Sequence, residues 1–139
     1  MILGFYVPPY GNVAWAALPE EGEQPPRYTT GLLPGGGGIA AVAGFLACHL
    51  RVHGAAAPRA VVLAPDDGSG VDELRGWCPP NPRTRWCAAT EAMAAASAAE
   101  MAKAKAEDSW ATWLRVGAEP NVVRAAALAW CELRSLSAA

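Results

Sequence analysis

The chain has 139 residues, a length that suits one folded domain and leaves no room for two conventional ones. Hydrophobic residues make up 53% of the chain and charged residues 17%, so it carries enough apolar side chains for a packed core. The net charge is −2, which argues against a general polyanion binder because such proteins usually carry a basic excess. We therefore expect a single domain, residues 1–139, with at most a local basic patch.

The distribution of apolar residues indicates whether the chain crosses a membrane and where in the cell it is expected. No run of about 18 apolar residues exists, so no membrane span is expected. The apolar start, Met1–Gly4, lacks the basic leader and the cleavage region of a secretory signal. The sequence predicts an intracellular protein without a membrane partner, placed in the cytoplasm, nucleoid or nucleus, or made in the cytoplasm as a virus or phage product.

Cysteine and histidine give little support for a metal site. The four cysteines, which form no CxxC pair, are Cys48, Cys78, Cys87 and Cys131. His49 and His53 are four residues apart, a spacing that suits two ligands on one helix face, but the glutamate of an HExxH motif is absent. Reduced, scattered thiols are the better interpretation, and we expect no metal and no cofactor.

The first third of the chain predicts strands. Ile2–Tyr6 is a short apolar run that ends at a proline-rich turn, as a buried strand does. Asn12–Leu18 follows as a second strand, and Arg27–Leu33, with its threonines, as a third. Three successive strands with short links favour an antiparallel meander.

The middle of the chain alternates helix and strand. Residues 34–38, a proline and four glycines, lead into a helix over Ile39–His53 but lack the lysine of a phosphate-binding loop. Ala60–Ala64 is apolar on both faces, as a strand covered on two sides should be. Val71–Trp77 predicts one short helix.

The last third predicts a strand at Thr84–Ala88, a helix from Thr90 to about Asp108 that Ser109–Val116 extends or follows, and a final helix from Pro120 to about Leu136. This order predicts an α/β fold with a five-stranded mixed sheet flanked by helices. Three of its strands are antiparallel, the central one pairing beside Ala60–Ala64, and Ile2–Tyr6 is an inner strand.

Three stretches carry a family resemblance. Ile2-Leu3-Gly4-Phe5-Tyr6 resembles the opening strand of RuvC-type Holliday-junction resolvases, which typically reads Ile-Leu-Gly-Ile-Asp. Residues 120–129 resemble the closing helix of that family, and residues 84–97 have the character of its last strand and following helix. The order of elements is similar to that of the ribonuclease H-like superfamily. The resemblance implies one ribonuclease H-like (RuvC-like) domain over residues 1–139.

The resemblance also implies where catalytic acids should stand. The family uses four carboxylates to hold two divalent ions about 4 Å apart across the scissile phosphate. Carried over onto this sequence, the first acid falls on Tyr6, or on Val7 if the register slips, and the second on Ala64. The last two fall on Val123 and Ala126. None of these side chains binds a metal, so the resemblance implies a vacant site with no catalytic residue and no nuclease activity.

Two aspartates offer an alternative. Asp66 and Asp67 follow Ala60–Ala64 closely, and after a register shift Asp66 matches the aspartate that ends this strand in ribonuclease H enzymes. They are the candidates for a relocated metal site in an active enzyme. A solvated turn before Gly68 is the favoured interpretation, because acidic partners on the first strand and last helix are missing. Neither Glu119 nor Glu132 stands where the metal geometry requires an acid.

Basic and aromatic residues interleave in the second half of the chain, a pattern that suits nucleic-acid contact. The candidate nucleic-acid-binding residues are Arg75, Arg83, Arg85, Lys103 and Lys105. In sequence, the only acids that interrupt this set are Glu91 and Glu100. Trp77 is a candidate interface residue, since tryptophan and arginine are enriched at protein interfaces. Core packing of Trp86 and a solvated face for the two lysines are the simpler interpretations.

Three hypotheses follow. The first is a catalytically inactive RuvC-like pseudonuclease that acts as a binding or scaffolding subunit in a nucleic-acid-processing complex. The second is an active metal-dependent resolvase or nuclease with relocated carboxylates, and the third an unrelated small α/β interaction domain. Near-neutral charge favours another protein subunit as partner over weak contact with branched or duplex DNA. Only Val71–Trp77 stands where the family has a long helix, so its usual dimer is not implied.

Overall fold

The computed structural model describes residues 2–8, 11–18, 30–33, 39–52, 58–64, 69–77, 84–107 and 119–138. Its strands are β1 (Ile2–Tyr6), β2 (Ala14–Leu18), β3 (Thr30–Leu32), β4 (Ala60–Ala64) and β5 (Arg85–Ala88). Its helices are α1 (Ile39–Val52), α2 (Ser69–Trp77), α3 (Glu91–Glu107) and α4 (Pro120–Ala138). Among these described residues, no helix is both long enough and apolar enough to cross a membrane.

The strands form one mixed sheet in the order β3-β2-β1-β4-β5. The pairs β1–β2 and β2–β3 are antiparallel, whereas β1–β4 and β4–β5 are parallel. The predicted five-stranded mixed α/β sheet, with Ile2–Tyr6 as an inner strand, is confirmed. The expectation that the central strand of the antiparallel trio pairs beside Ala60–Ala64 is wrong. The central strand of that trio is β2, and the strand that pairs with β4 is β1, because its parallel pairing places it between the trio and β4.

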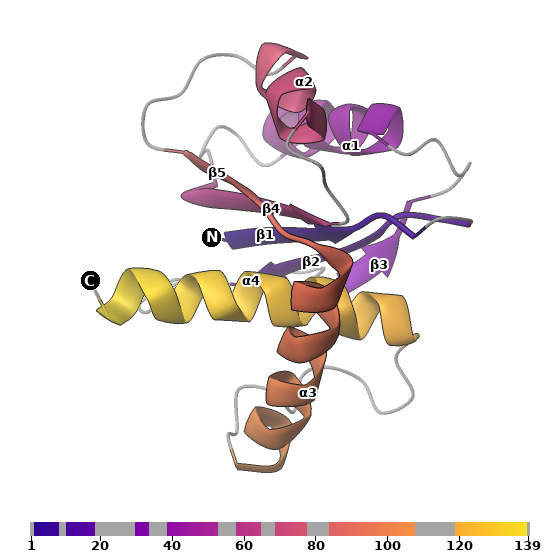
Figure 1. Cartoon of the computed structure of the whole chain (residues 1–139). Helices are drawn as coiled ribbons and strands as arrows, with labels where there is room; N and C mark the ends of the chain where they lie inside the picture. The colour runs from indigo at the N-terminus through magenta and orange to yellow at the C-terminus, as the bar shows by residue number, and fades with distance from the viewer. Residues whose placement is uncertain are drawn as a thin grey trace.

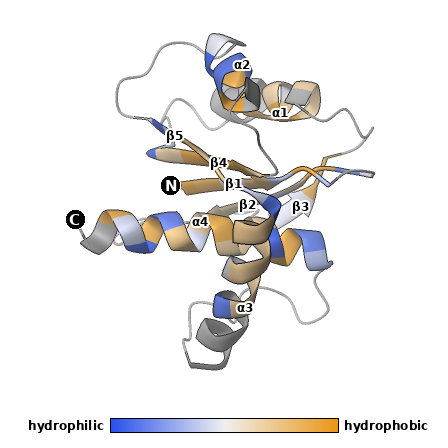
Figure 2. Ribbon diagram, in the orientation of Figure 1, coloured by the Kyte–Doolittle hydropathy of each residue, from blue (hydrophilic) through white to orange (hydrophobic). Residues whose placement is uncertain are grey.

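Helices cover both faces of the sheet, with α1 and α2 on one side and α3 and α4 on the other (Figure 1). Each side has its own buried core, which we call the α1/α2 face and the α4 face. Along β1, Leu3 and Phe5 enter the α1/α2 face, while Ile2 and Tyr6 enter the α4 face, because successive strand residues point to opposite sides. Apolar residues colour β1 and β4 along their length (Figure 2), as burial on both faces requires.

The α4 helix approaches the sheet closely at Gly4. A methyl group added at Gly4 would clash with the carbonyl oxygen of Ala125, and it would lie 3.1 Å from the Cβ of Ala129. Glycine is therefore required at this position by space and not by backbone conformation. The small side chains of α4 let its backbone lie against the middle of β1.

Several element boundaries differ from the sequence-based expectation. The second strand starts at Ala14, after Gly11, whose φ of 99° is a left-handed conformation that turns the chain. The third strand covers only Thr30–Leu32, and residues 27–29 lie outside the described residues. The helix expected from Val71 begins at Ser69, and α4 continues to Ala138. Pro120 is the first residue of α4, where its missing N–H costs no hydrogen bond.

Candidate functional site

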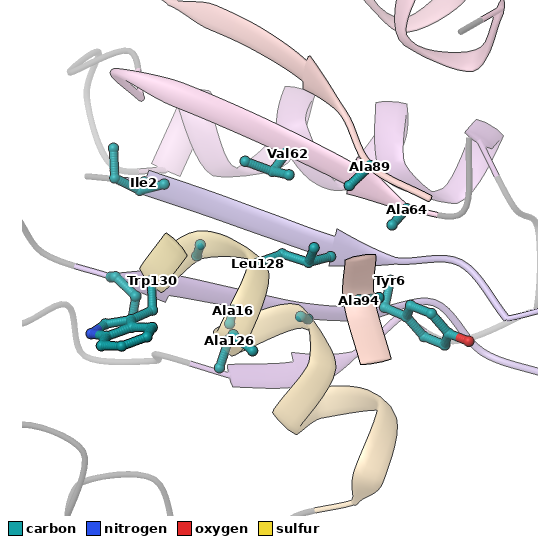
Figure 3. Close-up of a cluster of buried hydrophobic side chains, with 14 of the residues drawn as sticks. Ile2, Tyr6, Ala16, Val62, Ala64, Ala89, Ala94, Ala126, Leu128 and Trp130 are labelled. Atoms are coloured by element: carbon teal, nitrogen blue, oxygen red, sulfur yellow. The ribbon is translucent and has the colours of Figure 1, made fainter. Parts of the chain in front are cut away.

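Three of the four positions to which the family resemblance assigns acids belong to one buried cluster, although Figure 3 places Ala126 beside Ala16 and away from Tyr6 and Ala64. Tyr6 and Ala64 are register partners at the ends of β1 and β4, and both belong to the buried cluster of the α4 face together with Ala126. Val123 lies one turn before Ala126 and is half-buried. Figure 3 shows Tyr6 beside Ala94 at one end of this cluster, with Trp130 at the other. The alternative register residue, Val7, packs against the α1/α2 face instead.

The hydroxyl of Tyr6 has a carboxylate partner from another element. Tyr6 is only 2% exposed, and its hydroxyl donates a hydrogen bond to Oε1 of Glu91 at 3.2 Å. Glu91 is the first residue of α3, and Thr90 caps this helix by accepting a hydrogen bond from the backbone N–H of Met93 at 3.1 Å. Because β5 leads almost directly into α3, the capped helix start holds Glu91 at the end of β1.

The positively charged side chain of Arg124 lies over the ring of the same tyrosine. The guanidinium carbon of Arg124 is 5.3 Å from the centre of the Tyr6 ring, within the range of a cation–π contact. Arg124 also donates from Nη1 to Oδ1 of Asn121 at 2.9 Å. The first turn of α4 is fixed in turn by Glu119, whose Oε2 accepts from the backbone N–H of Asn121 at 3.1 Å. We name Tyr6, Glu91 and Arg124 the tyrosine cluster.

The tyrosine cluster changes the acidity of the phenol. Burial raises the pKa of Tyr6 above its usual value of 10.0, and the Glu91 carboxylate raises it further, while Arg124 partly offsets both effects. Tyr6 is therefore a neutral hydrogen-bond donor at physiological pH. It holds the end of the central strand to the start of α3, and it is not poised as a base.

The residues at this end of the sheet do not fit a two-metal centre. Among the described residues no group of three or more histidine, cysteine, aspartate or glutamate side chains is placed to hold a metal ion. Glu91 is the carboxylate seen in contact with Tyr6, and the guanidinium of Arg124 brings a positive charge to the same ring. Positions 64 and 126 carry buried alanine methyl groups, which offer none of the oxygen donors that magnesium requires.

Of the five basic residues of the sequence-based prediction, those on described helices lie on both sides of the sheet. Arg75 lies on α2, over the α1/α2 face, whereas Lys103 and Lys105 lie on α3, on the other side of the sheet (Figure 1). The structure describes the backbone of these two lysines and not their side chains, and Arg83 lies outside the described residues. Within the described residues, Arg75 is therefore separated by the sheet from the helix that carries Lys103 and Lys105.

Two of these basic residues have acidic neighbours in space other than Glu91 and Glu100. Nη1 of Arg75 is 3.9 Å from a carboxylate oxygen of Asp72, and Nη1 of Arg85 is 3.3 Å from Oε1 of Glu132. The second contact pairs opposite charges without hydrogen-bond alignment, because Oε1 of Glu132 is buried and receives no hydrogen bond. The sequence around Arg85 does not indicate its contact with Glu132, because Glu132 lies on α4 and approaches Arg85 only in the folded chain.

Two free thiols flank this ion pair. Cys87 on β5 and Cys131 on α4 are both half-buried and unbridged. Burial raises the pKa of Cys87, and the nearby Glu132 carboxylate raises it further. Burial also raises the pKa of Cys131, whose Sγ lies 3.4 Å from Oγ of Ser97 and 3.6 Å from Oε2 of Glu100. These are protonated packing thiols rather than nucleophiles, in line with the expected reduced cysteines.

The remaining candidate residues are the two tryptophans and the two aspartates of the sequence analysis, and the structure describes them to different extents. Trp86 is half-buried against the α1/α2 face, which confirms its core interpretation. Trp77 is the last residue of α2, and the structure describes its backbone alone. Asp66 and Asp67 lie outside the described residues, so the relocated metal site stays a prediction.

Glu91 and Arg124 are the site residues that sequence reasoning missed. One signal was available for Arg124, since it stands between Val123 and Ala126, the two helical positions where the family places acids. No family model, curated protein or solved structure matches this chain.

Proposed function

We propose that this chain is a ribonuclease H-like, RuvC-like pseudonuclease that serves as a binding or scaffolding subunit in a nucleic-acid-processing complex. The element order and the mixed sheet with an antiparallel trio agree with that resemblance. One observation carries the functional part of the proposal. Tyr6 and Ala64, two of the positions assigned to acids, lie side by side at the ends of β1 and β4, and Ala126 belongs to the same buried apolar cluster of the α4 face.

Physical chemistry explains why such a cluster would not cleave phosphodiesters by the family mechanism. That mechanism requires carboxylate oxygens that hold two divalent ions and stabilise the attacking and leaving oxygens. Ala64 and Ala126 are fully buried at 0% exposure, so they offer neither an oxygen ligand nor access for a phosphate. A carboxylate placed there without metal would itself be an unpaired buried charge, which is strongly unfavourable.

The charges of the described residues favour a protein partner. Arg75 and Arg85 each have an acidic neighbour, and Lys103 and Lys105 stand on the other side of the sheet from Arg75. Nucleic-acid binding depends on a contiguous set of cations that displaces counterions from successive phosphates. A chain of net charge −2 with dispersed cations offers little of this electrostatic attraction.

A cleavage assay tests the loss of chemistry. Purified protein with magnesium or manganese should leave four-way junctions, nicked duplexes and RNA–DNA hybrids intact. Cleavage that disappears in Asp66→Asn or Asp67→Asn would favour the active enzyme with relocated carboxylates and overturn the proposal. The matched control is Asp72→Asn, because Asp72 is an exposed acid on the following helix, beside Arg75.

A salt titration tests the class of partner. If the protein made about three phosphate contacts, its affinity for duplex DNA would fall by roughly ten- to a hundredfold between 50 and 200 mM salt. We expect instead no retention of branched or duplex DNA at 50 mM salt, with Arg83→Ala/Arg85→Ala indistinguishable from the parent protein. Salt-sensitive retention that this double variant abolishes would replace the protein partner with DNA.

A further inference from the structure

We infer that two copies of this chain pair through the outer edges of their β5 strands, antiparallel and about a two-fold axis at Cys87, so that the two sheets become one. β5 is the last strand in the sheet order, and among the described residues no strand lies beyond it (Figure 1). This edge shares no residue with the tyrosine cluster, and it would serve a scaffolding subunit and an active enzyme equally well.

The outer edge of β5 has backbone groups that no described strand pairs with. On the inner side, the N–H of Arg85 donates to the residue before β4 at 2.8 Å, and the N–H of Ala89 donates to β4 at 2.9 Å. Backbone groups alternate in direction along a strand, so those of Trp86 and Ala88 point away from β4. Each copy thus presents two donors and two acceptors, which an antiparallel strand satisfies in pairs.

β5 lacks the features that usually keep an edge strand from pairing, which are an outward charge, a proline or a bulge. Its register with β4 is unbroken, and its four residues include no proline. Its one charged residue is Arg85, whose Nη1 lies 3.3 Å from Oε1 of Glu132 on α4. This ion pair holds the charge against α4, so the charge does not protect the edge.

The side chains of β5 favour a second copy as the partner. Trp86 and Ala88 point to the same side of the strand, because successive side chains alternate. Trp86 is half-buried against the α1/α2 face, and Ala88 is exposed. Antiparallel pairing about Cys87 places the bulky Trp86 of each copy opposite the small Ala88 of the other. The edge is therefore complementary to itself, as a two-fold interface requires.

The same register sets Cys87 opposite its counterpart in the second copy. The two cysteines form a pair without backbone hydrogen bonds, in which opposing Cα atoms are about 4.5 Å apart. Disulfide bonds span Cα separations of about 4.4–6.8 Å, so two thiols at the axis can be crosslinked. Cys87 is a free thiol, and its crosslinking therefore reports on this register.

Two matched proline variants test the surface. Ala88→Pro removes an outward N–H from β5 and leaves the bonds to β4 in place, as a proline on an edge strand can. Leu32→Pro does the same on β3, the opposite edge strand. The N–H of Leu32 also points outward, because the N–H of the next residue, Leu33, donates to the neighbouring chain segment at Val13.

Sedimentation equilibrium measures the effect of these variants, with circular dichroism to establish that each is folded. The wild-type mass should rise towards twice that of the monomer between about 5 and 500 µM, because so short an edge gives a weak dimer. Ala88→Pro should weaken the dimer about tenfold or more, since each dimer loses two hydrogen bonds. Leu32→Pro should leave it unchanged. A wild-type protein that stays monomeric, an unaffected Ala88→Pro or an equal loss in Leu32→Pro overturns the inference.

Thiol crosslinking gives a second readout if Ala88→Pro does not fold. Diamide accepts two electrons and two protons as two thiols become one disulfide. At the upper end of the same concentration range, Cys131→Ser should still yield a crosslinked dimer, and Cys87→Ser should not. Burial raises the pKa of both thiols, so a difference between these variants reports proximity and not acidity.

A Cys131→Ser protein that does not crosslink, or a Cys87→Ser protein that crosslinks equally well, overturns the inference. Junction cleavage by the wild-type protein would instead contradict the proposed function, and it would leave both tests of the dimer intact.

Discussion

The two faces of the sheet are built from different side chains. The α1/α2 face is filled by large residues, among them Leu3, Phe5, Trp15, Leu46 and Leu63. The α4 face depends on small ones, and its alanines are Ala14, Ala16, Ala60, Ala64, Ala89, Ala94, Ala125, Ala126, Ala127 and Ala129. Large side chains separate α1 and α2 from the sheet, whereas alanines let the backbone of α4 come up to Gly4. The tyrosine cluster lies at the end of the closely packed face.

This difference explains why the site is closed. A buried carboxylate needs space, hydrogen-bond donors or a cation, and the alanine-lined end of the α4 face provides none of these at Ala64 or Ala126. At the end of β1, polar contacts appear where Tyr6 meets Glu91 and Arg124. The α4 face thus has a tight apolar interior beside this polar cluster.

Truncating a large side chain of the α1/α2 face should cause the largest loss of stability. Phe5 is fully buried and meets Phe45 edge to face, with ring centres 5.7 Å apart. Phe5→Ala should lower the free energy of unfolding by about 3–5 kcal/mol, because it removes apolar contact and leaves a cavity. Urea denaturation measures the loss. Met93→Ala, at a side chain 54% exposed, is the control and should cost less than about 0.5 kcal/mol. Similar losses in both variants would contradict the packed core.

Enlarging a small side chain at the α4 face should also lower the stability of the protein. Gly4→Ala adds a methyl group against the carbonyl oxygen of Ala125 and should cost about 1–3 kcal/mol. The same methyl in Gly44→Ala, within α1, meets no atom within 4 Å and should stabilise the protein by about 0.5–1 kcal/mol. Opposite signs in thermal unfolding are the expected result. A neutral or stabilising Gly4→Ala would mean that α4 does not lie against β1.

The smallest effect concerns the polar end of the α4 face and depends on pH. Because the pKa of Tyr6 is raised in the folded state, its contribution to stability is fully present below about pH 10, the usual tyrosine value. That contribution is lost as pH rises through the higher folded-state pKa. Tyr6→Phe should therefore cost about 1 kcal/mol at pH 7 by loss of the hydrogen bond, yet show a shallower decline above pH 10. Parallel stability–pH curves for the two proteins would argue against the tyrosine cluster.

Local sequence patterns predicted most of the fold. The doubly apolar runs Ile2–Tyr6 and Ala60–Ala64 indicated strands buried on both faces, and Pro120 marked the start of the last helix. The short third strand was harder, because Trp15 lies against Gly31 and this contact comes from a different strand. Periodicity reports which residues are buried, but it does not report such pairings.

The site was less predictable than the fold. A family pattern identified Tyr6, Ala64 and Ala126 as positions that should meet, and they share one buried cluster. The same pattern could not reveal the contacts of Tyr6, because Glu91 and Arg124 reach it only after α3 and α4 have packed on the sheet. Ion pairing of Arg85 with Glu132 was missed for the same reason.

The central claim is that the end of β1, where a two-metal nuclease would hold its ions, is closed by the chain's own side chains. A magnesium titration followed by amide ¹H–¹⁵N correlation spectra tests it most directly, with EDTA-treated protein as the starting point. The account predicts no saturable shift at the amides of Val7, Glu91 and Arg124, which surround Tyr6. Saturable movement of these three amides, while distant amides stay still, would contradict it.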